Sequence, residues 1–127
     1  MIAAAHVHPI AIDGFSAELE PPYKVRLRGR LTVQNPETLV LPFFRSIHDH
    51  ALATGAREIE IDLLELGFFS SSAIRAMLAW LGWVQALDEP QRYALAFRGR
   101  ASATWQTTTL DALRELGQGV VTVRMQT

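Results

Sequence analysis

Four segments of this sequence alternate apolar and polar residues with the two-residue period of a β-strand, and this alternation limits the folds open to the chain. The segments are 24–31, 58–63, 93–98 and 120–125. A strand with helices on both sides would be apolar throughout, because both rows of its side chains would be buried. The alternation therefore predicts a sheet with its helices on one face and water on the other.

The outward-facing rows of two of these strands carry opposite charges. One row is basic and the other acidic: Lys24, Arg26, Arg28 and Arg30 against Glu58, Glu60 and Asp62. If the two strands are neighbours, these side chains pair across the sheet. The net charge is -1, so the chain as a whole has no attraction for nucleic acid or an anionic membrane. We interpret the arginine row as a solvated, ion-paired face rather than a nucleic-acid stripe.

Helix signals separate the strands, and together they indicate an α/β protein. Three helices are predicted, over residues 36–54, 72–87 and 108–116. A further strand is expected around 15–19, with Pro21 and Pro22 in the turn that follows it. We expect one domain over residues 1–127, with a mixed, mostly parallel sheet of about five strands and a flexible segment at 1–12.

Cap residues set the expected helix ends. Asn35 is expected to cap the first helix and Pro36 to occupy its first position, while Pro42 should kink this helix or delay its regular start. Thr108 and Asp111 resemble a capping box for the third helix. The first helix is expected to bury one stripe: Leu39, Phe43, Ile47 and Ala51.

The second helix has a wider apolar arc than contact with a sheet requires. Ile74, Leu78 and Leu81 mark the centre of the arc. Trp80 and Trp83 extend it toward one flank. We expect Trp80 to pack against a neighbouring helix, and we leave Trp83 open as a contact with a partner or with a second copy of the chain.

Three consecutive serines stand where the acidic strand gives way to the second helix. Ser70, Ser71 and Ser72 follow the apolar pair Phe68 and Phe69. A helix start offers unpaired N–H groups and a positive dipole end, so a phosphate on one of these serines would accept those bonds and add roughly two negative charges at pH 7. One serine is expected to cap the helix, and the other two indicate either a regulatory turn or an ordinary serine-rich loop.

This segment resembles the STAS domain, named for sulfate transporters and anti-sigma factor antagonists. In that family a strand ending in Asp-Leu is followed eight residues later by an Asp-Ser-Ser-Gly motif that opens the next helix, and here Asp62-Leu63 is followed at the same spacing by Ser70-Ser71-Ser72-Ala73. Gly29 in the early strand fits the family as well. Pro42 and the Trp105-Gln106 pair are similar to a subgroup of stand-alone bacterial STAS-like regulators. The resemblance covers residues 15–125 and implies the STAS-like fold.

The resemblance implies a non-enzymatic, cytoplasmic domain that binds proteins in a bacterial partner-switching pathway. Members of the anti-sigma antagonist type are phosphorylated on the second serine of the motif, which corresponds to Ser72, with Ser70 and Ser71 as alternates. An ATP-binding serine kinase that is also the anti-sigma factor adds the phosphate, and a phosphatase removes it. The alternative is a non-switching accessory subunit docked on a transporter ATPase. The replacement of the family's Asp by Ser70 and of its Gly by Ala73 favours this alternative.

A partner is expected to contact the serine turn and the second helix. The expected contact residues are Phe69, Ser70, Ser71, Ser72, Ala73, Arg75, Trp83, Arg98 and Arg100. Arg98 and Arg100 flank Gly99 at the end of a strand that we expect near the turn. There they would receive a phosphate or an acidic partner, or else form a solvated loop.

Other chemistries find little support in the sequence. The chain has no cysteine, which excludes a disulfide, a thiolate zinc site and a cysteine nucleophile. His48 and His50 diverge by about 200° on a helix and are poorly placed to share a metal ion, and nothing in the sequence marks a metal site at His6 and His8. The serines lack the glycines that flank a hydrolase nucleophile. We therefore expect no catalytic residue, metal or cofactor.

The expected location follows from what the sequence lacks. The N-terminus has neither the basic start nor the long apolar run of a signal peptide. The longest apolar stretch, 73–87, is interrupted by Arg75 and Gln85 and is too short to cross a bilayer. We expect no membrane insertion and a cytoplasmic protein.

Overall fold

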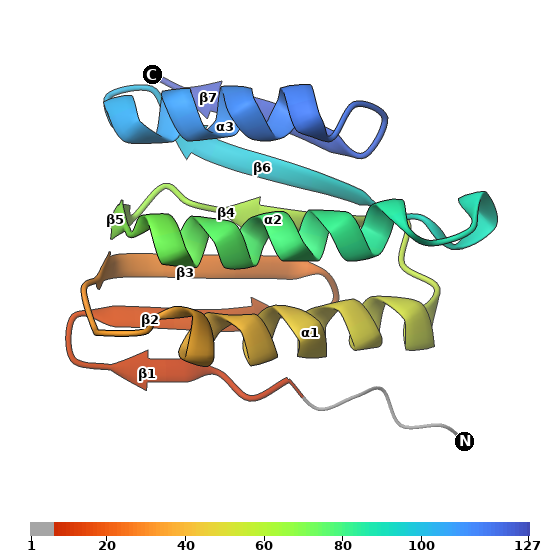
Figure 1. Ribbon diagram of the computed structural model, residues 1–127, viewed down its shortest axis with the longest axis horizontal. Coiled ribbons are helices and arrows are strands. Elements are labelled where there is room, and N and C mark those ends of the chain that lie inside the picture. The colour runs from red at the N-terminus through yellow and green to blue at the C-terminus, as the bar shows by residue number, and fades with distance from the viewer. Residues whose placement is uncertain (1–6) are drawn as a thin grey trace.

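Three helices cover one face of a single mixed sheet in the computed structural model, which describes residues 7–127 (Figure 1). The elements follow one another along the chain as β1 (Ile10–Ile12), β2 (Phe15–Glu20), β3 (Lys24–Leu31), α1 (Glu37–Thr54), β4 (Glu58–Asp62), β5 (Leu66–Phe69), α2 (Ser71–Gln85), a 3₁₀ turn (Glu89–Gln91), β6 (Ala94–Arg100), α3 (Thr104–Leu116) and β7 (Val121–Gln126). The predicted α/β class and the single layer of helices are confirmed.

The sheet has seven strands in the order β1-β2-β3-β4-β6-β7, and β5 also pairs with β3. Strands β1, β2 and β3 are antiparallel, and β3, β4, β6 and β7 are parallel. Strands β4 and β5 lie one after the other along β3, because residues 63–65 leave the sheet between them. The predicted number of about five strands is too small, because β1 and β5 are too short to show a period in the sequence.

Strand β1 also corrects the expected flexible N-terminus. Ile10 is only 8% exposed and pairs with Ala17 of β2, so residues 10–12 belong to the sheet. The part of that segment at residues 1–6, including His6, lies outside the described residues. Burial of the Ile10 side chain contributes roughly 1.5–3 kcal/mol to holding the three-residue strand, in addition to its backbone pairing with β2.

The alternation predicted for the strands is confirmed. Val25, Leu27, Ile59, Ile61 and Leu95 are fully buried beneath the helices. The side chains of the residues between them point to the opposite face, which we call the open face. Pro21 and Pro22 form the turn between β2 and β3, as predicted.

Helix α1 begins differently from the prediction. Asn35 does not cap it: this residue has a left-handed φ of 51°, and Pro36 occupies the N-cap position without a side-chain hydrogen bond. An N-cap residue has extended backbone, so the left-handed conformation of Asn35 does not fit that position. The Asn35 carbonyl instead accepts the N–H and the hydroxyl of Thr38, at 3.1 and 2.8 Å. The buried stripe includes Val40, while Leu39 is only half-buried.

Pro42 lies inside α1, which continues through it. Proline in the second turn removes the single hydrogen bond to the carbonyl of Thr38, which is near the helix start. The Ser46 hydroxyl donates to the Pro42 carbonyl at 3.0 Å. The expected delay of the helix start therefore does not occur.

Helix α3 begins at Thr104, four residues before the predicted start. Thr108 and Asp111 form no cap, and Asp111 instead accepts a hydrogen bond from Arg114 at 2.8 Å. The first turn of α3 contains Gln106, which is polar but buried. The residues around it show no apolar helical period, so the sequence does not predict a helix there. The contacts of Gln106, described below, hold this earlier start in place.

Candidate functional site

The three serines occupy the junction between β5 and α2, and each hydroxyl has a different environment. Ser70 is the N-cap of α2, and its Oγ accepts the Ala73 N–H at 3.3 Å. Ser71 is the first helical residue, one position before the predicted start, and it is exposed. The Oγ of half-buried Ser72 accepts a hydrogen bond from Arg75 Nη2 at 3.0 Å. One serine therefore caps the helix, as expected, and two remain for other roles.

Buried apolar residues support this serine turn from below. Phe69 is 4% exposed and its ring centroid lies 6.3 Å from that of Phe15. Ala73 is fully buried in the first turn of α2, and its N–H is the group that Ser70 caps. Both residues were expected to contact a partner, but their side chains face the core and hold the turn in place.

A shallow groove runs from the serine turn between α1 and α2. It has a volume of about 230 Å³ and is lined by Glu37, Leu41, Ser72, Arg75, Ala76 and Ala79. Small residues on α2 keep the groove open beside the larger side chains of α1. The Glu37 carboxylate contributes a buried Oε2 without a hydrogen-bond partner. The groove thus joins an acidic group, a basic group and a serine hydroxyl.

Gln106 connects the loop before β5 to the strand that precedes α3. Its Nε2 donates to the carbonyls of Leu63 and Leu66 at 2.8 and 2.9 Å, and its Oε1 accepts the Arg100 N–H at 2.8 Å. The neighbouring Trp105 donates its Nε1–H to the Gly67 carbonyl at 3.1 Å. These bonds satisfy the backbone groups exposed where β4 breaks from β5. The sequence singled out this residue pair only through a family resemblance, without its role.

Two expected contact residues lie on the other face of the sheet. Leu95, Phe97 and Gly99 of β6 are buried under the helices, so Arg98 and Arg100 point to the open face. The sheet separates them from the serine turn. The strand position was predicted correctly, but alternation along β6 directs these side chains away from the helices.

Trp83 lies twelve residues along α2 from Ser71, roughly 18 Å away. Its half-buried ring lies 5.8 Å from the ring of His48 and 5.0 Å from the guanidinium of Arg45. Trp80 is fully buried and stacks on Phe44 of α1 at 5.0 Å, as predicted for a helix neighbour. Trp83 is therefore not part of the serine turn.

A buried polar cluster joins α1, α2 and the start of β6. The Tyr93 hydroxyl accepts the Trp80 Nε1–H at 2.8 Å and lies 2.7 Å from His48 Nδ1. The hydroxyl keeps its one proton to donate to His48 Nδ1 in the tautomer that carries the ring proton on Nε2. Burial lowers the pKa of His48, Arg45 lowers it further and Asp49 opposes this effect, while burial raises the pKa of Tyr93. Sequence reasoning missed this cluster, because its members are far apart in the chain.

The two histidines of α1 have separate surroundings. His48 bonds Tyr93, whereas His50 Nε2 lies 3.3 Å from the Pro22 carbonyl. Their divergence was predicted from the helical period. Among residues 7–127, no three histidine, cysteine, aspartate or glutamate side chains converge as a metal site.

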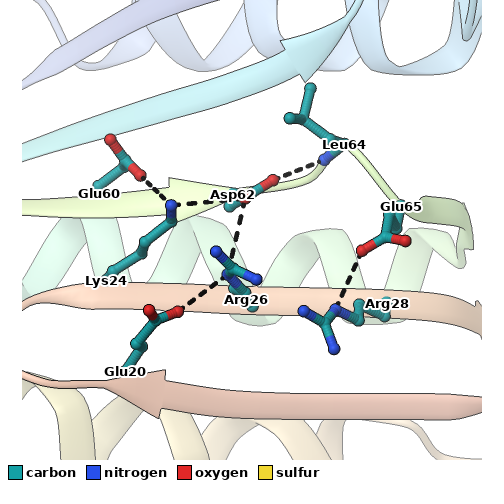
Figure 2. A network of polar contacts seen from close by, with 8 residues as sticks. All are labelled: Glu20, Lys24, Arg26, Arg28, Glu60, Asp62, Leu64 and Glu65. Atoms are coloured by element: carbon teal, nitrogen blue, oxygen red, sulfur yellow. Dashed lines mark hydrogen bonds and ion pairs between the residues drawn. The ribbon is translucent and has the colours of Figure 1, made fainter.

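The open face carries the ion pairs expected between the basic and acidic strands (Figure 2). Strand β3 lies next to β4, and Lys24 Nζ is 3.4 Å from Glu60. Arg26 Nε is 3.0 Å from Glu20 and 3.9 Å from Asp62, and Arg28 Nε is 3.1 Å from Glu65. Asp62 also accepts the Leu64 N–H at 2.9 Å, at the point where β4 ends. The prediction of a paired, solvated face is confirmed for these residues.

These features define an α/β protein with a STAS-like fold: a mixed sheet, helices on one face and a hydroxyl-bearing turn at the start of α2. SiaC of Pseudomonas aeruginosa has this fold, with a TM-score of 0.60 and 18% identity over 94% of this chain and 99% of SiaC. A chain in the structure of diguanylate cyclase SiaD in complex with its activator SiaC, also from P. aeruginosa, matches with a TM-score of 0.61 and 18% identity, over 88% of this chain and 92% of that one. The sequence matches no protein-family model and no curated protein.

No helix within residues 7–127 combines the length and the apolar character that a membrane crossing requires.

Proposed function

We propose that this chain is a non-enzymatic regulatory domain that binds a partner protein through the serine turn and the groove between α1 and α2. The observation that carries the proposal is the exposed, hydroxyl-bearing start of α2 on a fold shared with SiaC, which is described as the activator of a diguanylate cyclase. An activator of that kind acts by binding. The groove offers this chain a surface of mixed charge beside the turn.

Phosphorylation of Ser72 is proposed as the switch, with Ser70 and Ser71 as alternates. A phosphate carries a charge of about -1.5 to -2 at pH 7. Arg75, which already donates to Ser72 Oγ, and the free N–H groups at the start of α2 would stabilise it. Glu37 lines the same groove and would repel it. The added phosphate would therefore change the groove from balanced to acidic and alter which partner it binds.

The partners proposed here are an ATP-binding serine kinase of the anti-sigma factor type and a phosphatase, as the STAS resemblance implies. The kinase would bind the unphosphorylated chain, and a second signalling protein would be released or engaged in turn. We place this exchange in the cytoplasm of a bacterium. A homodimer of this chain is a separate proposal, and Trp83 is its candidate contact residue.

The test is the intact mass of the chain after incubation with ATP and a candidate serine kinase of the anti-sigma factor type. We expect a single added phosphate that Ser72→Ala abolishes, because this variant removes the acceptor oxygen. Ser71→Ala is the matched control at the exposed neighbouring position, and it should still gain the phosphate. Loss of the shift in Ser71→Ala alone would move the switch to Ser71. Hydrolytic activity that depends on Ser72 would contradict the non-enzymatic proposal.

The second candidate is a non-switching accessory subunit of a transporter ATPase. The observation that favours it is the serine turn itself, where Ser70 is a hydroxyl cap in place of the family's carboxylate and Ala73 is buried in place of its glycine. Stable co-purification with such an ATPase, together with no phosphate after incubation with the kinase, would support this candidate over the switch.

A further inference from the structure

The open-face arginines of β6 and β7 lack the acidic partners that Lys24, Arg26 and Arg28 have on β3. Lys24, Arg26 and Arg28 each have a carboxylate oxygen within 3.4 Å (Figure 2). Arg98 of β6 and Arg124 of β7 have no carboxylate within 4.0 Å in the described part of the chain. Pairing therefore accounts for one half of the open face and leaves the other half unexplained.

The unpaired arginines lie directly opposite each other. Arg98 is the register partner of Arg124 across the parallel pair β6–β7 and of Asp62 across β4–β6. The Asp62 carboxylate is engaged by the Leu64 N–H and lies within 4.0 Å of Lys24 and Arg26 instead. Like charges in this position repel each other, so a shared anion would remove an unfavourable contact. Two guanidinium groups side by side also provide the donor geometry that phosphate and carboxylate oxygens accept.

Arg98 has an unmet hydrogen bond as well. Its Nε is buried and has no acceptor. The Nε atoms of Arg26 and Arg28 also lack an aligned hydrogen bond, but each has a carboxylate oxygen at 3.0 or 3.1 Å. A buried donor without an acceptor is costly, and an acceptor from outside the chain would satisfy it.

A hollow lies beside these arginines. Its volume is about 280 Å³, and Arg98, Arg124, Thr122, Ala96, Glu58 and Glu60 line it. The floor is low because Ala96 stands between Glu60 and Thr122, its register partners on either side. The hollow is therefore basic at one end and acidic at the other.

The acidic end has one carboxylate to offer a ligand. Glu60 is engaged by Lys24 at 3.4 Å, whereas Glu58 is exposed and has no cation within 4.0 Å among residues 7–127. Glu58 lies on β4 two residues before Glu60, on the side away from Arg98. A ligand that spans the hollow would place a positive group or hydrogen-bond donor near Glu58.

We propose that this hollow binds a small zwitterionic molecule, with a phosphate or carboxylate on Arg98 and Arg124 and an ammonium group near Glu58. The Thr122 hydroxyl at the edge of the hollow supplies a further hydrogen-bonding group. The sheet separates this site from the serine turn, so the proposal does not depend on the proposed function.

The test is an NMR titration of the full chain with phosphoethanolamine, followed through the amides of β6 and β7 and the Arg98 Nε–H. We expect saturable shifts confined to the hollow. Arg98→Gln and Arg124→Gln should each weaken binding by about tenfold or more, because each removes a charged donor. Arg114→Gln is the matched control, since Arg114 lies on α3 and pairs with Asp111. Its affinity should equal that of the unchanged chain.

Further variants and probes separate the two ends of the ligand. Glu58→Gln should weaken phosphoethanolamine binding but leave the weaker binding of inorganic phosphate unchanged. Arg98→Lys retains the charge and should keep part of the affinity, which distinguishes a lost contact from a misfolded variant. Absence of saturable shifts, or equal affinity in Arg98→Gln and Arg114→Gln, would overturn the proposal. Sedimentation with phosphatidylethanolamine vesicles without binding of the soluble compound would also overturn it, because the ligand would then be a membrane surface.

Discussion

At the scale of single residues, the side chains that matter most are polar and buried. Gln106 is fully buried and forms three hydrogen bonds to backbone groups from two separate parts of the chain. A buried backbone group that loses its partner pays its full desolvation cost. The local structure between β4 and α3 therefore depends on one amide side chain.

Replacing Gln106 with Met tests this dependence. The variant keeps the volume but removes the side-chain partner of the Leu66 carbonyl and the Arg100 N–H, and leaves the Leu63 carbonyl with only the Leu66 N–H at 3.1 Å. We therefore expect the free energy of unfolding to fall by about 3 kcal/mol. Gln85→Met is the matched control, because Gln85 bonds the Leu116 carbonyl at an exposed site and its loss should cost less than about 1 kcal/mol. Urea denaturation measures both. Equal losses in the two variants would show that Gln106 acts only as a surface side chain does.

His48 gives the second prediction at this scale. Burial lowers its pKa in the folded chain below the ordinary value of 6.5, so the unfolded chain binds a proton first as the pH falls. The contribution of neutral His48 is complete above pH 6.5, decreases as the pH falls from 6.5 toward the lowered pKa, and is constant below that pKa. We expect the free energy of unfolding to fall over this interval.

The measurement is urea denaturation at a series of pH values. His48→Gln keeps a polar group near Tyr93 but has no proton to gain, so this variant should lose the pH-dependent decrease. His50→Gln is the control on the same helix, and it should retain the decrease. A profile in His48→Gln identical to that of the unchanged chain would assign the pH dependence to other groups.

At the scale of elements, the strand β3 joins the hairpin to the parallel part of the sheet. Gly29 of β3 donates its N–H to the Glu65 carbonyl at 2.9 Å, and Arg30 donates to the Gly14 carbonyl at 2.7 Å. The register shifts between these two residues, and Gly29 has a φ of +90°. This conformation brings the β1–β2 turn and the loop before β5 against the same point of β3.

Gly29→Ala is expected to destabilise the chain strongly. A Cβ at this position would overlap the carbonyl of Gly14, and the left-handed backbone adds its own strain. We expect a loss of about 3 kcal/mol or more, measured as a lowered Tm. Gly55→Ala is the matched control: its φ is +68° but nothing lies near the added methyl group, so about 1 kcal/mol is expected. Equal shifts in Tm would mean that the overlap at Gly29 is relieved without cost.

At the scale of the whole molecule, the one-sided layer of helices creates two independent surfaces. The helical face carries the serine turn and the α1–α2 groove, and the open face carries the ion pairs and the hollow at Arg98 and Arg124. A sheet with helices on both sides would have no second polar surface. The proposed switch and the proposed ligand site can therefore be tested separately on the same protein.

Local signals in the sequence account for the parts of the fold that depend on near neighbours. The period of the strands determined the single helical layer, the basic and acidic rows on the open face, and the burial of Val25 and Ile61. The width of the apolar arc on α2 predicted the contact of Trp80 with another helix. These properties depend on spacing along the chain, which the sequence displays directly.

Contacts between distant segments were decided only by the tertiary structure. The early start of α3 depends on Gln106 bonding residues about forty positions away, and the cluster of His48 and Tyr93 joins residues 45 positions apart. The position of Arg98 away from the serine turn follows from the side of the sheet to which β6 directs it. The sequence by itself determined the buried rows of the strands, because alternation depends only on spacing along the chain. Partners far apart in the chain were determined by the order of the strands, because hydrogen bonds and charges act only over the short distances that folding creates.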